Sequence, residues 1–150
     1  MYLIVEDCSI NSCIMKILTF GVFDMLHIGH ILLFKHAKEF YPGQECELIV
    51  AVQDAASILK YKPNTKMINT TEERLFMVSA IRYVDKVVTY NDVDVDIEKI
   101  DFDVFAKGPD QCHTGFQKAV SWCEANGKTV VTIPRTEGIS SSMLREYSKL

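Results

Sequence analysis

The sequence predicts an α/β protein with a parallel five-stranded sheet and helices on both of its faces. Short apolar segments of strand length alternate along the chain with longer segments whose apolar residues recur at helical spacing. Proline, glycine and asparagine residues separate several of these segments. Because strands that alternate with helices are joined by right-handed crossovers, the pattern favours a single Rossmann-like domain.

The first half of the chain predicts two strands with a helix between them. Residues 16–20 are a short apolar strand that ends at a glycine. Residues 29–40 carry apolar side chains at helical spacing among charged ones, and Pro42-Gly43 then breaks the helix. Residues 48–52 form a second apolar strand. Residues 54–69 show weak periodicity and predict a long loop, which in a compact domain is usually functional or disordered.

The middle of the chain predicts a capped helix followed by two strands. Thr70 and Glu73 have the spacing of a capping box, in which each side chain accepts the other residue's backbone N–H. The apolar side of the helix that they start continues to Ile81. A third strand covers residues 86–90, and a short connection leads to a fourth strand over residues 103–106.

The last third predicts a helix, a strand and a final helix. Asn126-Gly127 ends the helix over residues 116–125, because glycine readily adopts the left-handed conformation found after helices. The fifth strand covers residues 129–133, and Ser140 caps a helix that continues to residue 147. Ligands in such folds bind beyond the carboxyl ends of the strands, so we expect the functional residues in the loops that follow them.

The composition is that of an ordinary globular domain. The chain has 150 residues, of which 48% are hydrophobic and 24% charged, and a formal net charge of −4. These values exclude a disordered chain and argue against a general nucleic-acid binder. No apolar run approaches the ~20 residues of a membrane-spanning helix. The five cysteines include no CxxC pair, so we expect reduced thiols and a cytoplasmic location, with no disulfide framework or zinc site.

Residues 1–15 lack the pattern of a secretory signal, because their apolar run is short and acids follow it. We expect an N-terminal extension there, as an extra edge strand or a loose arm, ahead of a domain over residues 16–150. An alternative is that translation begins at Met15.

The most informative segment is Gly21-Val22-Phe23-Asp24-Met25-Leu26-His27-Ile28-Gly29-His30. The chain leaves a strand here and starts a helix, where free backbone N–H groups favour an anion. His27 and His30 are spaced to lie on one side of the turn, and Gly29 would let the backbone approach a ligand. A phosphate chain is the expected occupant. The alternatives are histidines that serve as core or capping groups, or that bind an adventitious metal.

Three motifs resemble those of one known family. Residues 21–30 resemble the HxGH motif of the nucleotidyltransferase superfamily, in its cytidylyltransferase-like branch. Residues 135–141 resemble the RTEGIST motif of glycerol-3-phosphate, choline-phosphate and ethanolamine-phosphate cytidylyltransferases. Glu73-Arg74 followed by residues 81–85 resembles the helix of the glycerol-3-phosphate enzymes that ends in IRYVD. Together the resemblance covers residues 16–147.

The resemblance implies that CTP and a phosphomonoester give a CDP-alcohol and pyrophosphate by in-line attack, without a covalent enzyme intermediate. Catalysis would rest on positioning and on neutralising charge at the phosphoryl oxygens. It implies no protein metal ligands, because Mg²⁺ would arrive with CTP, held by phosphate oxygens and water. A homodimer is expected by family analogy alone.

The resemblance also assigns roles to individual residues. His27 and His30 would contact the triphosphate, and Lys60 and Lys62 would form a mobile clamp on the acceptor phosphate and the nucleotide. The residues assigned to nucleotide binding are Phe20, Gly21, Val22, Phe23, Gly29, Lys107, Asp110, Arg135, Thr136, Ile139, Ser140 and Ser141. Arg74 and Arg82 would contact the acceptor.

Several of these residues have plain structural alternatives. The two lysines could be a solvated surface feature. Arg82 could pair with Asp85, and Arg74 with a glutamate of its own helix. Asp24 is expected to cap the turn. Five aspartates at 92, 94, 96, 101 and 103 could form a metal cluster or a solvated surface.

The sequence departs from the glycerol-3-phosphate enzymes at two points. Val22 replaces the threonine of their GTFD string, and the GVFD form also occurs among adenylyltransferases that act on heptose phosphates. Residues 107–113 differ from their GDDW-like loop, which leaves the acceptor open. The alternatives are therefore an adenylyltransferase for a sugar phosphate and a non-catalytic nucleotide-binding sensor.

Overall fold

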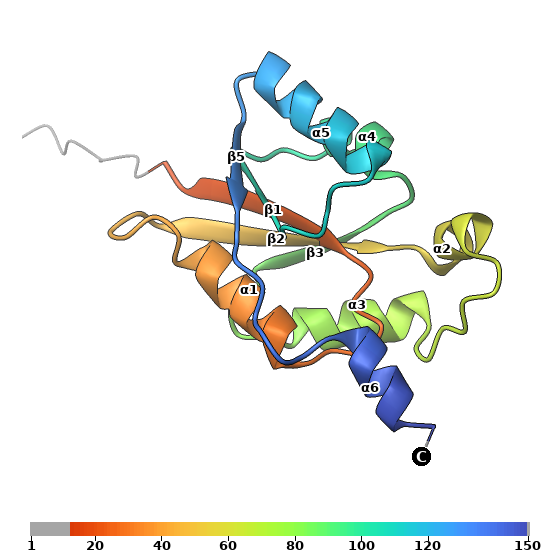
Figure 1. The fold of residues 1–150 in the computed structure, drawn as a ribbon. Helices are drawn as coiled ribbons and strands as arrows, with labels where there is room; N and C mark the ends of the chain where they lie inside the picture. The colour runs from red at the N-terminus through yellow and green to blue at the C-terminus, as the bar shows by residue number, and fades with distance from the viewer. Residues whose placement is uncertain (1–12, 150) are drawn as a thin grey trace, which may run out of the picture.

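A computed structural model describes residues 13–149, and its five strands form one parallel sheet in the order β3-β2-β1-β4-β5 (Figure 1). The strands are β1 (Met15–Gly21), β2 (Cys46–Gln53), β3 (Lys86–Tyr90), β4 (Val104–Lys107) and β5 (Thr129–Thr132). The helices are α1 (Ile28–Lys38), α2 (Ala55–Tyr61), α3 (Thr71–Ser79), α4 (Val93–Asp96), α5 (Thr114–Ala125) and α6 (Ser141–Tyr147), with a 3₁₀ turn over Ile97–Lys99. The predicted fold class is confirmed.

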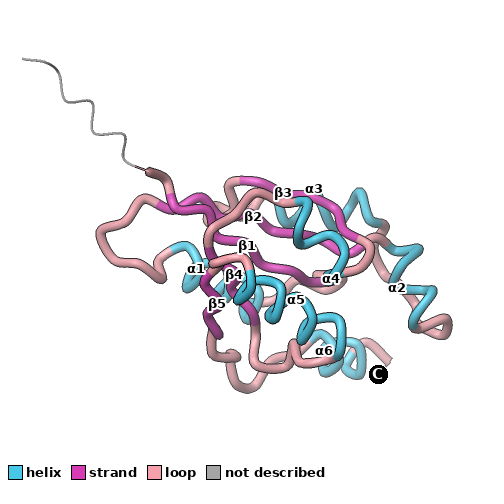
Figure 2. The backbone as a smooth tube through the Cα atoms, turned by 90° about the horizontal axis from the view of Figure 1, so that it is seen from above, coloured by secondary structure: helices cyan, strands magenta, loops and turns pink. Residues whose placement is uncertain are grey.

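The central strand β1 divides the core into two layers, because successive side chains of a strand point to opposite faces. Ile17 packs in the layer that contains Phe34 of α1 and Val78 of α3. Leu18, the next residue, packs in the layer that contains Phe116 of α5. Figures 1 and 2 show α1 and α3 on one face of the sheet, with α4 and α5 on the other. Burial of both faces explains why the inner strands β1, β2 and β4 read as nearly continuous apolar runs.

The capping signals located helix boundaries well. The Thr70 hydroxyl accepts the Glu73 N–H at 3.1 Å, and the Glu73 carboxylate accepts the Thr70 N–H at 2.8 Å, so the predicted capping box is present. Gly127 has a φ of +68° and follows α5, as expected. The Ser140 hydroxyl caps α6 by accepting the N–H of Met143 at 3.1 Å.

Two helical segments were not predicted. The segment expected as a long loop contains α2, and the connection before β4 contains α4 and the 3₁₀ turn. Helix α2 is only two turns long and buries one side chain, Ile58, so it leaves almost no periodic signal. Asp54 starts this helix by accepting the Ala56 N–H at 2.9 Å.

Residues 1–12, most of the expected N-terminal extension, lie outside the described residues. Met15 already belongs to β1, and its N–H donates to the Glu45 carbonyl at 3.0 Å. No helix of the described chain is long and apolar enough to cross a membrane. Among the described cysteines, Cys46 and Cys123 are buried, Cys13 and Cys112 are exposed, and all four are free thiols.

Candidate active site

The candidate site lies at the point in the sheet where the order of the strands reverses. Strands β1 and β4 are neighbours at the centre, and the chain leaves β1 toward β2 on one side and β4 toward β5 on the other. Such a switch point leaves a crevice beyond the carboxyl ends of the two strands. A cleft of about 580 Å³ occupies this place, lined among others by His27, His30 and Arg135.

The loop after β1 is held in a strained conformation by Phe23. This residue has a φ of +54°, which side chains other than glycine rarely adopt. Its buried ring packs edge-on against His30 and Phe34, with both ring centroids at 5.2 Å. A Cβ at Gly21 would overlap the same ring, so position 21 has room only for glycine. The loop therefore supports the histidine pair through the contact between the Phe23 and His30 rings.

The two histidines are oriented by backbone groups. The Gly29 N–H donates to His27 Nδ1 at 3.0 Å, and the His27 N–H donates to His30 Nδ1 at 3.4 Å. Because each Nδ1 accepts a hydrogen, the proton of each neutral ring is on Nε2. The rings stack with centroids 3.9 Å apart, and both line the cleft. The pair thus offers two N–H donors side by side.

Gly29 serves this arrangement in a way that the sequence did not predict. A Cβ at this position would lie 2.8 Å from Cε1 of His27 and 2.9 Å from its Nδ1. The absence of a side chain therefore makes room for the His27 ring, and Gly29 also lines the cleft as expected.

Burial keeps both rings neutral at physiological pH. It lowers the pKa of His30 to about 4, with a smaller contribution from the charge of His27. Burial also lowers the pKa of His27, assisted by the positive charge of Arg135. Neutral imidazoles here donate from Nε2 without adding positive charge to the cleft.

The structure separates the two lysines that were predicted to form a clamp. Lys62 is the C-cap residue of α2 and lines the cleft. Lys60 lies outside the lining, and its ammonium group sits 5.3 Å from the centre of the Tyr61 ring. Only Lys62 therefore joins the histidines in this arrangement of α2.

The opposite wall of the cleft comes from the loops after β4 and β5. Arg135 pairs with Asp110 at 2.5 Å, which holds the guanidinium at the rim. Gln111 was not predicted, yet its amide donates to the Phe20 carbonyl at 2.7 Å and accepts the Gly108 N–H at 3.0 Å. It thereby joins the ends of β1 and β4. No local motif marks it, because one partner is 91 positions away in sequence.

Most residues assigned to nucleotide binding lie together. The cleft lining includes Phe20, Gly21, Val22, Phe23, Gly29, Asp110, Arg135, Thr136, Ile139, Ser140 and Ser141. Lys107 is not part of the lining. Lys107 is the last residue of β4, and its backbone carbonyl accepts the Ile133 N–H at 2.8 Å, which extends the pairing of β4 with the chain after β5.

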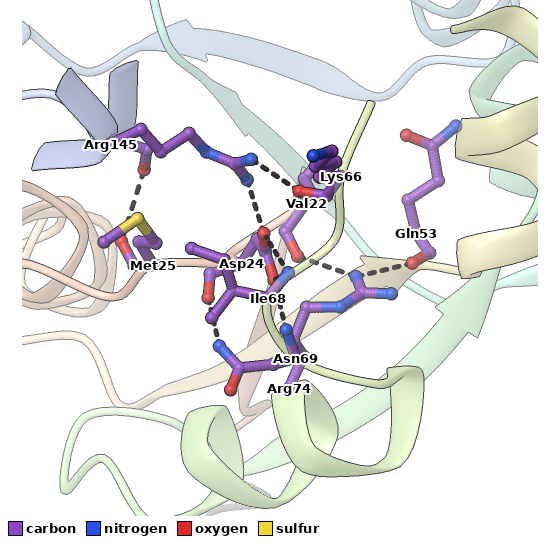
Figure 3. A network of polar contacts seen from close by, with 10 residues as sticks. Val22, Asp24, Met25, Gln53, Lys66, Ile68, Asn69, Arg74 and Arg145 are labelled. Carbon is purple, nitrogen blue, oxygen red and sulfur yellow. Dashed lines mark hydrogen bonds and ion pairs between the residues drawn. The ribbon is translucent and has the colours of Figure 1, made fainter. Parts of the chain in front are cut away.

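Asp24 joins three segments that are far apart in sequence (Figure 3). Its buried carboxylate accepts the N–H groups of Ile68 and Asn69, the latter at 2.8 Å, and forms an ion pair with Arg145. Arg145 also donates to the Lys66 carbonyl at 2.8 Å. Asp24 was expected to cap its own turn. Instead it fixes the loop after β1 against the segment before α3 and against α6.

Arg74, expected to contact the acceptor, is fully buried and lies outside the cleft lining. Its guanidinium donates to the carbonyls of Val22 at 2.8 Å and Gln53 at 2.7 Å (Figure 3). It also donates to the Thr71 hydroxyl at 3.2 Å. Arg74 therefore links the carboxyl ends of β1 and β2. It forms no ion pair with a glutamate of its own helix.

Arg82 lies at the opposite end of the sheet from the histidines. It precedes β3 and lines a separate surface depression near the start of β2. Its guanidinium lies 5.5 Å from the centre of the Tyr83 ring. The predicted alternative, a pair with Asp85, is not formed, because Asp85 is bound by Lys38. In this structure Arg82 is separated from the cleft by the length of the strands.

A second hollow of about 690 Å³ adjoins the cleft. Gly21, Val22, Ile58, Lys62 and Gln111 line both. The second hollow extends from these shared residues toward the end of β3 and the start of α5, where its lining includes Tyr90 and His113.

The five aspartates that could have formed a metal cluster are spread over separate contacts. Asp92 accepts the Tyr61 hydroxyl at 2.5 Å, whereas Asp94 pairs with Lys118 and Asp96 with Lys99. The remaining two contact Lys16, Asp101 through the side chain and Asp103 through the backbone N–H. Within residues 13–149, no three or more histidine, cysteine or acidic side chains are grouped to hold a metal ion.

Comparison with known proteins gives several matches. A family model described as cytidylyltransferase-like matches residues 18–147. The chain is 36% identical over 135 residues to a glycerol-3-phosphate cytidylyltransferase of Staphylococcus aureus, covering 87% of this chain and 92% of the relative. It is 42% identical over 99 residues to an FAD synthase of Thermococcus kodakarensis, covering 64% of this chain and 63% of the relative.

A solved structure shows the same fold. It is a lipopolysaccharide core biosynthesis protein from Thermoplasma volcanium, with a TM-score of 0.62 at 24% identity, covering 81% of this chain and 96% of that one.

Proposed function

Since the chain belongs to the cytidylyltransferase-like family of nucleotidyltransferases, we propose that it transfers CMP from CTP to a small phosphorylated alcohol. The products would be a CDP-alcohol and pyrophosphate. The observation that carries the proposal is the pair of Nε2–H donors from His27 and His30, which face one cleft together with Lys62 and Arg135. This set of donors matches the oxygens of a triphosphate.

The reaction needs no nucleophile from the protein. A phosphate oxygen of the acceptor attacks the α-phosphorus of CTP, and the bond from that phosphorus to the bridging oxygen of the β-phosphate breaks. The attacking oxygen is already anionic, so no base has to remove a proton from it. The protein's task is to hold the two substrates in line and to stabilise charge on the phosphoryl oxygens.

The histidines suit this task because backbone groups fix them before substrate binds. Donors that need no reorientation during the reaction stabilise a transition state more effectively than mobile ones. Lys62 and Arg135 supply positive charge from opposite walls of the cleft. Arginine's planar group suits phosphate, and its pair with Asp110 holds it at the rim.

We propose that Mg²⁺ binds together with CTP. Mg²⁺ prefers oxygen ligands and keeps several waters, so triphosphate oxygens and water would coordinate it without protein side chains. Bound there, it would neutralise charge on the leaving pyrophosphate.

The second hollow suits the acceptor. It meets the cleft at Lys62, which could bind the acceptor phosphate while the alcohol portion extends toward Tyr90. This placement puts the acceptor phosphate beside the triphosphate, as in-line attack requires.

Adenylyl transfer to a sugar phosphate is the second candidate. Val22 lines the junction of the two hollows and offers no hydroxyl to the triphosphate, in contrast to the threonine of the GTFD string. A relative at 42% identity is named FAD synthase, which also supports an adenine nucleotide.

The test measures Mg²⁺-dependent pyrophosphate release from CTP and, separately, from ATP. Each nucleotide is paired with glycerol 3-phosphate, ribitol 5-phosphate, phosphocholine, phosphoethanolamine and heptose 1-phosphate. We expect release with CTP and its loss by ~100–1000-fold in His30→Ala, because one preorganised donor is removed. Release with ATP alone would favour the second candidate. Nucleotide binding without release in any pair would favour a sensor.

A further inference from the structure

The sheet opens between β1 and β4 at the point where the cleft begins. Strand β1 pairs with β2 as far as Gly21, whereas its pairing with β4 ends at Leu18 and Phe105. The backbone carbonyl of Phe20, a fully buried residue, therefore lies beyond the last pair that β1 forms with β4. Buried backbone carbonyls are nearly always paired, and the side chain of Gln111 reaches this one from the loop after β4.

The side chain of Gln111 takes the place of a backbone peptide group in this gap. Its Nε2 donates to the Phe20 carbonyl at 2.7 Å, and its Oε1 accepts the Gly108 N–H at 3.0 Å. The backbone N–H of Gln111 also donates to the Gly108 carbonyl at 3.2 Å, which closes the turn after β4. A neutral amide can donate and accept at the same time, whereas a lysine side chain only donates and an ionised glutamate only accepts.

Each end of this bridge leads to donors that line the cleft. The Phe20 end continues into the loop that carries the two histidines. At the other end, the turn that Gln111 closes contains Asp110, whose carboxylate pairs with Arg135 at 2.5 Å. The histidines and Arg135 line the cleft from opposite walls. The length of one side chain therefore sets the spacing between the two walls.

Gln111 also lies where the two hollows meet. It lines both the cleft and the second hollow, as Val22 and Lys62 do. The proposed function brings the acceptor phosphate and the α-phosphorus of CTP together at this junction. The spacing of the walls therefore decides whether donors from both walls reach the phosphoryl oxygens while the attack is in line.

We propose that Gln111 is a positioning residue for the transfer step, whose neutral side-chain amide holds the histidine loop and the Arg135 wall at the spacing that in-line attack requires. The inference rests on the proposed function and adds a residue that acts through the backbone groups of Phe20 and Gly108. A displacement of ~1 Å at a reacting centre can cost about 100-fold in rate. Loss of the bridge should therefore lower kcat and leave nucleotide binding nearly unchanged.

The first experiment replaces the amide in Gln111→Met, which keeps the length of the side chain and removes both of its hydrogen bonds. Pyrophosphate release is measured with the full chain, Mg²⁺ and the nucleotide and acceptor that give the fastest release in the panel above. We expect kcat to fall by roughly 100-fold and the KM for the nucleotide to change by less than about threefold. An unchanged kcat would refute the positioning role, whether or not the melting temperature falls.

The second experiment uses Gln111→Glu, which keeps the size of the side chain and does not depend on the folding of the methionine variant. The ionised carboxylate can still accept the Gly108 N–H, but it cannot donate to the Phe20 carbonyl. We expect kcat to fall by at least about tenfold, the value of one hydrogen bond.

Gln117→Met is the matched control for both variants. The Gln117 amide donates to the Cys112 carbonyl at 2.8 Å in the same part of the chain, but Gln117 lines neither hollow. This variant should leave kcat and both KM values unchanged, and an equal loss of kcat would refute a specific role for Gln111.

The outcomes separate the two proposals. Failure of the unmodified chain to release pyrophosphate in any pair would overturn the proposed function and this inference with it. Release by the unmodified chain, with an undiminished kcat in either folded Gln111 variant, would overturn the inference alone.

Discussion

Acidification should destabilise the protein through His30, and the effect can be isolated with His30→Asn. Asparagine can still accept a hydrogen bond and donate one, but it does not titrate. The free energy of unfolding of both proteins is measured across a pH series. Only the change in their difference with pH matters, so any constant cost of the substitution cancels.

The expected magnitude follows from the burial of the ring. Burial lowers the pKa of His30 from 6.5 to about 4 in the folded protein. Below pH 6.5 the His30 ring binds a proton in the unfolded chain but stays neutral in the folded chain. The free energy of unfolding therefore decreases as the pH falls, and the decrease levels off below pH 4. At 1.36 kcal/mol per pH unit, the wild type should lose about 2 kcal/mol relative to His30→Asn between pH 7.5 and pH 5.

Urea unfolding gives the required free energies. The chain has one tryptophan, Trp122 of α5, which packs partly buried against the core layer on that face of the sheet and reports unfolding by fluorescence. His27 remains in both proteins, so most of its own titration cancels. A difference between the two proteins that stays constant from pH 7.5 to pH 5 would refute the conclusion that the folded His30 ring is kept neutral by burial.

Three further predictions concern the residues around the cleft. Lys62→Ala should lower kcat/KM by about 100-fold and Lys60→Ala by less than about threefold, because only Lys62 lines the cleft; equal losses in steady-state assays would contradict the separation of the pair. Arg74→Met should destabilise the fold by about 4 kcal/mol, because two partly buried carbonyls lose a charged donor, and urea unfolding would measure it; a loss below about 1 kcal/mol would show that these carbonyls find other partners. Asp24→Asn should weaken CTP binding in calorimetry by about tenfold, because Arg145 loses its ion pair and α6 its anchor; unchanged affinity would separate the anchor from nucleotide binding.

Local signals predicted the fold because the inner strands of the sheet are buried on both faces. All five predicted strands are present, and the two edge strands, β3 and β5, were marked by β-branched residues rather than by long apolar runs. The capping box at Thr70 and Glu73 and the serine at position 140 located two helix starts. The segments missed, α2 and α4, are short helices that bury one side chain each, and so little burial leaves no pattern to detect.

The site could be predicted only where its residues are close in sequence. One continuous string contains both histidines together with the residues that orient them. The roles of Arg74 and Asp24 depend on partners 21 to 121 positions away, so no spacing reveals them. Arginine at position 74 matched a motif, but the motif does not show whether its charge faces substrate or backbone.

The ion pair between Asp24 and Arg145 has a consequence for the order in which the molecule becomes functional. The two residues are 121 positions apart, and one wall of the cleft lies in the segment that precedes Arg145. The loop after β4 already supplies Asp110 and Gln111 to that wall, whereas residues 133–142 are held against the loop after β1 by the ion pair. The last wall of the cleft is therefore completed only when the end of the chain has been synthesised, and truncation ahead of Arg145 should weaken nucleotide binding by releasing residues 133–142 from Asp24.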